Sequence, residues 1–348
     1  MTGLWFGIVS VMLTMFVVMD GFDLGAGVLH LFVARTDDER RRVLAAIGPY
    51  WDANEVWLLA TGGALFVAFP KVLASGLSGF YLAIFLVLWC LVLRGISIEF
   101  RSHVAAPMWR GFWDLTFAVA SILLCIFFGC ALGNLLRGLP LNADGWFGLT
   151  LFTSFTTRMP VGILDWYTVL AGVYALLALT MHGGAFLCWK SEGVLLDRCR
   201  VMALRVGLLV TALWPVMTYL TVRVNPAMFH NLAARPLAWV CIGIAVAGQA
   251  VLLFGLLRGS YRNALLGSSA FLLGLLAATA VSVFPVMLRS AGDPSLSIDA
   301  FQASNTPDGL RTALHWWLVG IPLVVVYFVI QFRVHAGKVH APREGEGY

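Results

Sequence analysis

Long apolar runs constrain this chain more than any other feature of its sequence. A helix crosses a bilayer with about 20 consecutive apolar residues, and nine such runs follow one another along the 348 residues. Backbone amides inside a bilayer must pair internally, and runs of this length are too long for barrel strands, so they predict helices. The runs lie at 4–34, 50–70, 75–98, 114–136, 163–188, 203–222, 236–257, 263–288 and 312–333.

Composition supports the same class of protein. Hydrophobic residues make up 60% of the chain and charged residues 12%, whereas soluble domains carry roughly 25% charged residues. The net charge of +5 does not indicate a nucleic-acid partner, because the arginines fall in short loops between apolar runs. We therefore expect an all-α polytopic membrane protein with about nine transmembrane helices in two bundles.

The distribution of lysine and arginine predicts the orientation. With nine spans, 16 of the 23 basic residues share one side with the C-terminal tail. By the positive-inside rule that side is the cytoplasm, so the N-terminus is expected outside. The other side holds seven basic residues, namely Lys71, Arg137, Arg158, Arg223, Arg235, Arg289 and Arg311.

A long segment rich in turn residues divides the chain. We expect a first four-helix bundle at 1–137, an outer loop at 138–162, a five-helix second half at 163–335 and a short cytoplasmic tail at 336–348. A helix start is predicted at Thr306, with proline at the first helical position, before the last span. The spacing Gly21-x-x-x-Gly25 and the pair Gly62-Gly63 are both expected to permit close helix packing.

Carboxylates within apolar runs are the most unusual feature. Asp52 and Glu55 are spaced i, i+3 and so share one helical face. A charge at the bilayer centre costs roughly 2.5–3.5 kcal/mol, so such groups are expected to have a partner or a water path. The alternative is that they lie at the headgroup level and only cap their helix.

Histidines and cysteines give weaker signals. His30 and His182 are expected toward the cytoplasmic ends of their helices, where a pair at matched depth could ligate haem b; ordinary hydrogen bonding is the alternative. The six cysteines form no C-x-x-C pair and are interpreted as packing residues rather than metal or redox sites.

Several motifs together resemble subunit II of cytochrome bd-type quinol oxidases, and their order covers nearly the whole chain. The short loops further resemble the cyanide-insensitive branch. Tyr50 stands where some members carry histidine, Ala53 where many carry glycine, and Arg158 in a region uncharged in others, so hydrogen bonding around Asp52 is expected to differ. The motifs are Asp20-Gly21-Phe22-Asp23-Leu24-Gly25, Trp51-Asp52-Ala53-Asn54-Glu55-Val56-Trp57, Gly62-Gly63-Ala64-Leu65-Phe66, Ser78-Gly79-Phe80-Tyr81, Phe100-Arg101-Ser102, Trp109-Arg110, Gly133-Asn134-Leu135-Leu136 and Phe284-Pro285.

The resemblance implies a bacterial inner-membrane oxidase that oxidises quinol and reduces dioxygen to water. In that family subunit I holds two haems b, one haem d and the quinol site, whereas subunit II ligates no haem. No catalytic, cofactor-binding or metal-binding residue is therefore assigned within this chain. A structural quinone, bound in some members, and a small single-span accessory subunit are further candidate partners, besides lipid.

The resemblance also associates acidic residues of the first two spans with proton delivery. We expect Asp20, Asp23, Asp52 and Glu55 to form part of a path from the cytoplasm. Asp23 lies about 11 residues, or roughly 16 Å, from the inner end of its span. Asp52 lies at a similar depth, roughly 15 Å beyond Arg42 if the intervening segment is helical. Two other readings remain open: a secondary transporter, whose inverted repeat is not visible in the sequence, and an independent haem-b cytochrome using His30 and His182.

Overall fold

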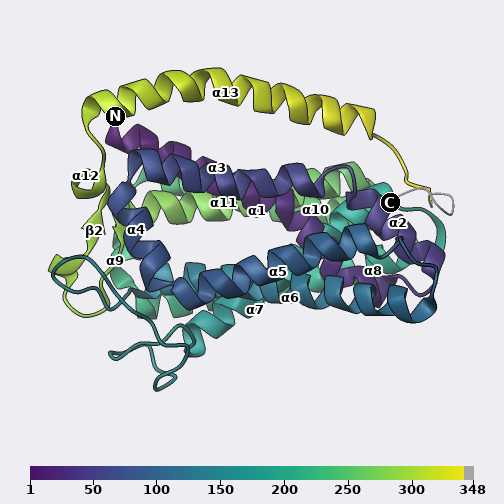
Figure 1. The fold of residues 1–348 in the computed structure, drawn as a ribbon, viewed down its shortest axis with the longest axis horizontal. Helices are drawn as coiled ribbons and strands as arrows, with labels where there is room; N and C mark the ends of the chain where they lie inside the picture. Colours follow the sequence, from purple (N-terminus) through teal and green to yellow (C-terminus); the bar gives the residue numbers. More distant parts are fainter. Residues whose placement is uncertain (341–348) are drawn as a thin grey trace.

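The computed structural model describes residues 1–340, and nine long helices run along its long axis (Figure 1). The long helices are α1 (Thr2–Val33), α3 (Trp51–Ala68), α5 (Tyr81–Phe100), α6 (Pro107–Arg137), α7 (Trp166–Lys190), α8 (Gly193–Val224), α10 (Pro236–Arg258), α11 (Tyr261–Val283) and α13 (Pro307–Val334). The short elements are α2 (Asp37–Ile47), α4 (Pro70–Gly79), α9 (Pro226–Ala234), α12 (Ala300–Ala303), the 3-10 turn η1 (Pro294–Leu296), and the antiparallel strands β1 (Val286–Leu288) and β2 (Ile298–Asp299).

The predicted fold class, an all-α polytopic membrane protein, is confirmed. Within residues 1–340, eight helices are long and apolar enough to cross a membrane. Helix α3 is not among them, because its 18 residues carry Asp52, Asn54 and Glu55 in the first turns. Helix α3 nevertheless packs along α1, and its membrane crossing, the ninth, stays a prediction.

The elements at the two ends of the long axis differ (Figure 1). The N-terminus, β2, α9 and α12 lie at one end, whereas α2 and the last turn of α13 lie at the other. Of the predicted tail at 336–348, residues 341–348 lie outside the described residues; nearer α13, the Val339 amide donates to the Lys190 carbonyl at 2.9 Å. The division into two bundles stays a prediction, since α1 packs directly against α7 across the proposed boundary.

Glycine allows α1 and α7 to cross almost backbone to backbone, as the Gly21-x-x-x-Gly25 spacing predicts. A Cβ atom added at Gly25 would lie 1.9 Å from the Leu179 carbonyl oxygen, and one added at Gly183 would lie 2.3 Å from the Gly25 carbonyl carbon. The packing role of Gly62-Gly63 stays a prediction: within residues 1–340, a Cβ built at either position meets no atom within 4 Å beyond its own stretch of helix.

Arginines cap helix C-termini at the expected outer end of the molecule. The last carbonyls of a helix have no partner within it and carry partial negative charge, so cationic donors stabilise them. Arg289 Nη1 donates to the Arg137 carbonyl of α6 at 2.7 Å, and Arg235 Nη1 donates to the Phe284 carbonyl after α11 at 2.8 Å. Three of the seven basic residues on the expected outer side therefore lie in helix-end contacts.

Helix α13 is held mainly at its two ends. Near its start, Trp5 Nε1 donates to the Leu310 carbonyl at 3.0 Å. Near its end, the Phe332 ring stacks on Tyr50 with centroids 4.9 Å apart. The start itself is confirmed as predicted, since the Thr306 hydroxyl accepts from the Gly309 amide at 3.3 Å. Much of the surface between the ends is exposed and apolar, including Leu323 at 67%.

The close crossing of α1 and α7 gives a stability prediction. We expect Gly25→Ala to destabilise the purified protein complex by about 1–3 kcal/mol, because the added methyl must push two backbones apart. The matched control is Gly62→Ala, where space is open and the helix propensity of alanine favours the change by up to about 1 kcal/mol. Thermal unfolding of both variants checks this; equal melting temperatures would contradict the crossing geometry.

Candidate functional site

Three of the four predicted carboxylates lie in an acidic cluster between α1, α3 and α5. The cluster consists of Asp20, Asp23, Asn54, Glu55 and Arg94. Asp20, Asp23, Asn54 and Arg94 are fully buried, and the Glu55 side chain is 24% exposed. Because α1 and α3 pack side by side, joined through the short helix α2, the acidic motif of each helix faces the other.

Arg94 joins the two helices electrostatically. Its Nη2 atom lies 2.7 Å from Asp20 Oδ1 and also pairs with Glu55 Oε1. Asn54 Nδ2 donates to Asp23 Oδ2 at 2.7 Å and to the Met19 carbonyl at 3.1 Å. The cluster thus holds three carboxylates against one guanidinium, and an uncompensated buried charge is costly. Proton binding is the chemistry that such an arrangement favours.

Several atoms of the acidic cluster lack protein partners. Within residues 1–340, Asp20 Oδ2, Asp23 Oδ1, Asn54 Oδ1 and both Nε and Nη1 of Arg94 make no hydrogen bond. Buried polar atoms are almost always bonded to protein or to ordered water. These atoms are therefore the places in the core of the helical domain where water or an exchanging proton is best accommodated.

The structure places Asp52 apart from these residues. Its side chain is exposed on the first turn of α3, and Asn54, not Asp52, reaches Asp23. The sequence analysis assigned no role to Arg94 or to the amide of Asn54. A signal for Arg94 was available, because an arginine in the middle of an apolar run requires a buried counter-charge.

A second charged network lies two turns further along α1, around His30. His30 Nε2 lies 2.6 Å from Asp114 Oδ1, and Asp114 also pairs with Arg101 at 2.5 Å and with Arg40 at 3.0 Å. Asp37 continues the network to the surface through Arg101 at 2.7 Å. Burial alone would lower the pKa of Arg101, but its hydrogen bonds and attraction to Asp114 and Asp37 raise it. We call these residues the His30 network.

His182 is not positioned to share a haem with His30. Its Nδ1 bonds the Ser268 hydroxyl at 2.7 Å and its Nε2 bonds the Val18 carbonyl at 2.8 Å. Val18 precedes His30 by 12 residues, about 18 Å along a helix. The expectation of matched depth is therefore wrong, and both nitrogens of His182 are already engaged. Residues 1–340 contain no group of three or more metal-ligating side chains, and all six cysteines are buried and free.

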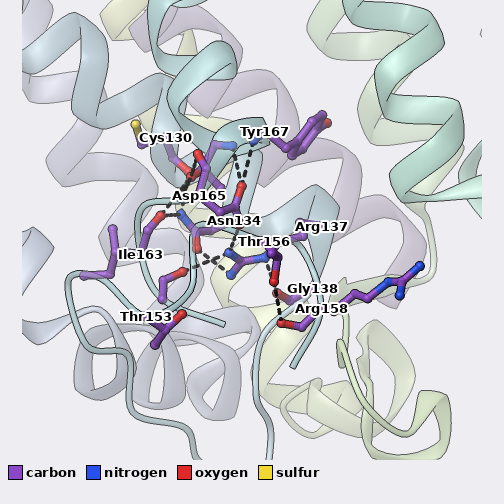
Figure 2. A network of polar contacts seen from close by, with 12 residues as sticks. Cys130, Asn134, Arg137, Gly138, Thr153, Thr156, Arg158, Ile163, Asp165 and Tyr167 are labelled. Carbon is purple, nitrogen blue, oxygen red and sulfur yellow. Dashed lines mark hydrogen bonds and ion pairs between the residues drawn. The ribbon is translucent and has the colours of Figure 1, made fainter. Parts of the chain in front are cut away.

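A third polar network fastens the outer loop to α6 and α7 (Figure 2). Asp165 is the N-cap of α7, with its Oδ1 accepting from the Tyr167 and Thr168 amides at 2.8 and 2.9 Å. Arg137 pairs with Asp165 Oδ2 and donates to Asn134 Oδ1 at 2.7 Å and to the Gly162 carbonyl at 2.8 Å. The Arg137–Asp165 ion pair is surrounded by loop carbonyls and the N-terminus of α7. We therefore interpret its contacts as holding the loop in place.

A large apolar cavity of about 490 Å³ lies near this loop. It is bounded by residues of α1, α6, α7, α8, α9, α10 and α11, including Phe16, Phe128, Tyr167, Trp214, Phe229 and Trp239. Tyr167 donates or accepts with Thr221 at 2.9 Å, whereas the Tyr174 hydroxyl, on the cavity wall, is buried and has no bond to any described residue. Its size and apolar lining are typical of sites for drug-sized ligands.

Comparison with known proteins agrees with the geometry. The family profile described as "Cytochrome bd terminal oxidase subunit II" matches residues 1–335. A "Probable cytochrome oxidase subunit 2" from Haemophilus influenzae is 30% identical, over 97% of this chain and 95% of its own. The "Cytochrome bd-I ubiquinol oxidase subunit 2" of Escherichia coli K12 is 30% identical over 93% of this chain and 91% of its own.

A solved structure shows the same fold. The bd oxidase structure from Geobacillus thermodenitrificans aligns with a TM-score of 0.70 at 16% identity, covering 96% of this chain and 98% of that one. The helices and relatives together define a multi-pass subunit of an oxidoreductase complex in the bacterial inner membrane. The chain belongs to the family of cytochrome bd terminal oxidase subunit II. This membership favours the oxidase over the transporter and the independent cytochrome.

The loop network predicts an asymmetry between two arginines. Arg137→Ala leaves Asp165 buried without its cation, which should cost about 3–5 kcal/mol. Arg158 is exposed in the same loop, so Arg158→Ala should stay within about 0.5 kcal/mol of the original protein. Thermal unfolding of the purified complex distinguishes the two; similar losses in both variants would show that the network contributes little.

Proposed function

We propose that this chain is the subunit of a quinol:dioxygen oxidoreductase that supports a haem-bearing subunit I and helps conduct protons to its oxygen-reduction site. The N-terminus is periplasmic and the C-terminus cytoplasmic, as the arginine distribution predicts. The observation that carries the proton role is the acidic cluster, where three carboxylates share one buried guanidinium. Reduction of dioxygen to water consumes protons, and a buried reaction site needs a route for them.

The acidic cluster is arranged to hand protons from α1 to the surface of α3. Asp23 and Asp20 lie one turn apart on α1. Arg94 then links Asp20 to Glu55, the member with partial exposure. Asp52 lies on the exposed face of the same helix, one turn before Glu55. We infer that protons leave this chain toward the partner subunit near Glu55, with Asp52 at the rim of that exit.

We propose that this chain ligates no haem, because its two candidate histidines are engaged elsewhere. His182 has both ring nitrogens bonded, and Asp114 holds His30 within an ionic network. Haem b and haem d are therefore assigned to subunit I, as is the oxidation of quinol. No step of oxygen chemistry is attributed to residues of this subunit.

Neutralising the inner carboxylate tests the proton role. In the assembled complex, Asp23→Asn should lower quinol-driven oxygen consumption per haem by roughly a hundredfold, within the range for loss of a positioned proton carrier. Asp52→Asn should have a smaller effect, because water can serve at an exposed rim. Oxygen-electrode turnover, normalised to haem content, is the measurement.

Asp144→Asn is the matched control, since Asp144 is an exposed carboxylate in the outer loop. It should leave turnover unchanged. Full turnover per haem in Asp23→Asn would refute the proton path. If Asp23→Asn loses haem but the complex that still assembles has normal turnover per haem, the cluster has a purely structural role.

The apolar cavity supports a second role, the binding of a structural quinone. Its aromatic and aliphatic walls suit a quinone ring and the start of an isoprenoid chain, and the unpaired Tyr174 hydroxyl suits a ring carbonyl oxygen as acceptor. The quinone here is a bound component, separate from the quinol oxidised in subunit I. A lipid chain is the competing occupant.

The hydroxyl of Tyr174 provides the test. Tyr174→Phe keeps the ring and removes the donor, so the quinone extracted from the purified complex should fall, by about fivefold or more if one hydrogen bond of about 1 kcal/mol is lost. Tyr219→Phe is the control, because Tyr219 is exposed and contacts Arg223. Chromatography of the extract measures quinone per haem; unchanged content in Tyr174→Phe would favour lipid.

A further inference from the structure

One face of α1 connects the acidic cluster to the His30 network. Asp20, Asp23, Gly27 and His30 are spaced i, i+3, i+7 and i+10, which places them on a single helical stripe. Asp23 and His30 are two turns apart, about 10.5 Å along the axis. The stripe is buried along this whole length within the described chain.

The His30 end of the stripe reaches the aqueous surface through charged residues. Asp37 is 43% exposed and pairs with Arg101, which is 1% exposed and pairs with Asp114. Arg40, which is 30% exposed, also pairs with Asp114. This chain of contacts leads from solvent at α2 to a fully buried imidazole. By the arginine distribution, the surface here is the cytoplasmic one.

Between the two charged ends, the stripe carries no large side chain on α1. Gly27 leaves space that the Ser121 hydroxyl of α6 occupies, since a Cβ at Gly27 would lie 2.1 Å from Ser121 Oγ. Ser121 itself donates only within its own helix, to the Phe117 carbonyl at 2.7 Å. The Phe117 ring packs edge-on against His30 with centroids 5.3 Å apart and forms the apolar wall beside the hydroxyl.

Unpaired polar atoms lie at both ends of this segment. His30 Nδ1 and Asp23 Oδ1 have no hydrogen-bond partner among residues 1–340, although both residues are fully buried. Such atoms are ordinarily bound by water when protein offers no partner. Ser121 packs against Gly27, between these two ends.

We propose that His30 is the cytoplasmic proton-uptake station of this subunit and passes protons along the Gly27–Ser121 segment to Asp23. This rests on the proposed proton path. Nε2–H donates to Asp114 throughout, while the Nδ1 lone pair accepts a proton from an adjacent water and releases it to a water that leads toward Asp23. No electron moves, and the ring returns to its starting form.

The charged groups around His30 suit this exchange. Asp114 of α6 contacts His30 Nε2 at 2.6 Å, and Arg40 of α2 and Arg101 after α5 both pair with the same carboxylate. Asp114 is a positioning residue here, because its two arginine partners keep it anionic and its contact fixes the His30 ring. A purely structural network would tie the same helices together without any exchange at Nδ1.

The experiment compares His30→Gln, Ser121→Ala and Asp23→Asn in the assembled complex. His30→Gln keeps a donor for Asp114 but carries no proton at neutral pH, so turnover per haem should fall roughly tenfold or more. The ratio of turnover in H2O to that in D2O should rise, because proton uptake becomes rate-limiting. Ser121→Ala removes no hydrogen bond between helices, since Ser121 donates to Phe117 of its own helix. It should lower turnover about two- to fivefold, a fraction of the range for a positioned proton carrier. His103→Gln is the control, since His103 is exposed and bonds only the Glu99 carbonyl.

The outcomes separate this inference from the proposed function. If Asp23→Asn is impaired while His30→Gln and Ser121→Ala keep full turnover and an unchanged isotope ratio, the path stands and the uptake station is refuted. If Asp23→Asn is fully active, the proposed path itself fails. If His30→Gln loses haem, the test rests on two further measurements: its turnover per remaining haem and the turnover of Ser121→Ala. If both equal the turnover of the original protein, the proposal is overturned.

Discussion

The interaction on which the inner structure depends is the ion pairing of Arg94 with Asp20 and Glu55. A buried guanidinium or carboxylate alone would carry a large desolvation cost, and together they offset much of it. The pairing fixes α5 against α1 and α3 at one depth. It also leaves three carboxylates against one guanidinium, which is the arrangement on which the proposed proton role rests. In that proposal, the contacts that hold the helices together are also those that bind protons.

The sequence predicted the fold class and most helices because the physical signal was strong. A run of about 20 apolar residues has few other structures available to it in a bilayer. Local sequence rules also predicted the helix start at Thr306 and the close packing of α1 at Gly25. At Gly62-Gly63 the rule is incomplete: small residues permit close approach but do not create a neighbour, and within the described chain α3 presents these glycines to open space.

The candidate site was predicted only in part. Asp20, Asp23 and Glu55 were identifiable because carboxylates in apolar runs are costly. Their partners were not, since Arg94 comes from a helix 39 residues after Glu55, and nothing local shows which face of α5 meets α1. Asp52 was grouped with Asp23 by depth alone. Depth fixes the distance along an axis but not the direction of a side chain, and the rotation of α3 instead turns Asn54 inward.

The attachment of α13 has a consequence for how the chain matures. Its first turn is bound by Trp5, a contact that joins positions 305 residues apart, and its last turn rests on Tyr50. Contacts with such large sequence separation form late. During synthesis, the Trp5 indole of α1 therefore has no Leu310 carbonyl to bond until nearly the whole chain has been made. Packing of α1 is therefore completed only when α13 has been inserted. A chain truncated before α13 would leave the Trp5 indole without its acceptor, a defect that proteases and chaperones could recognise.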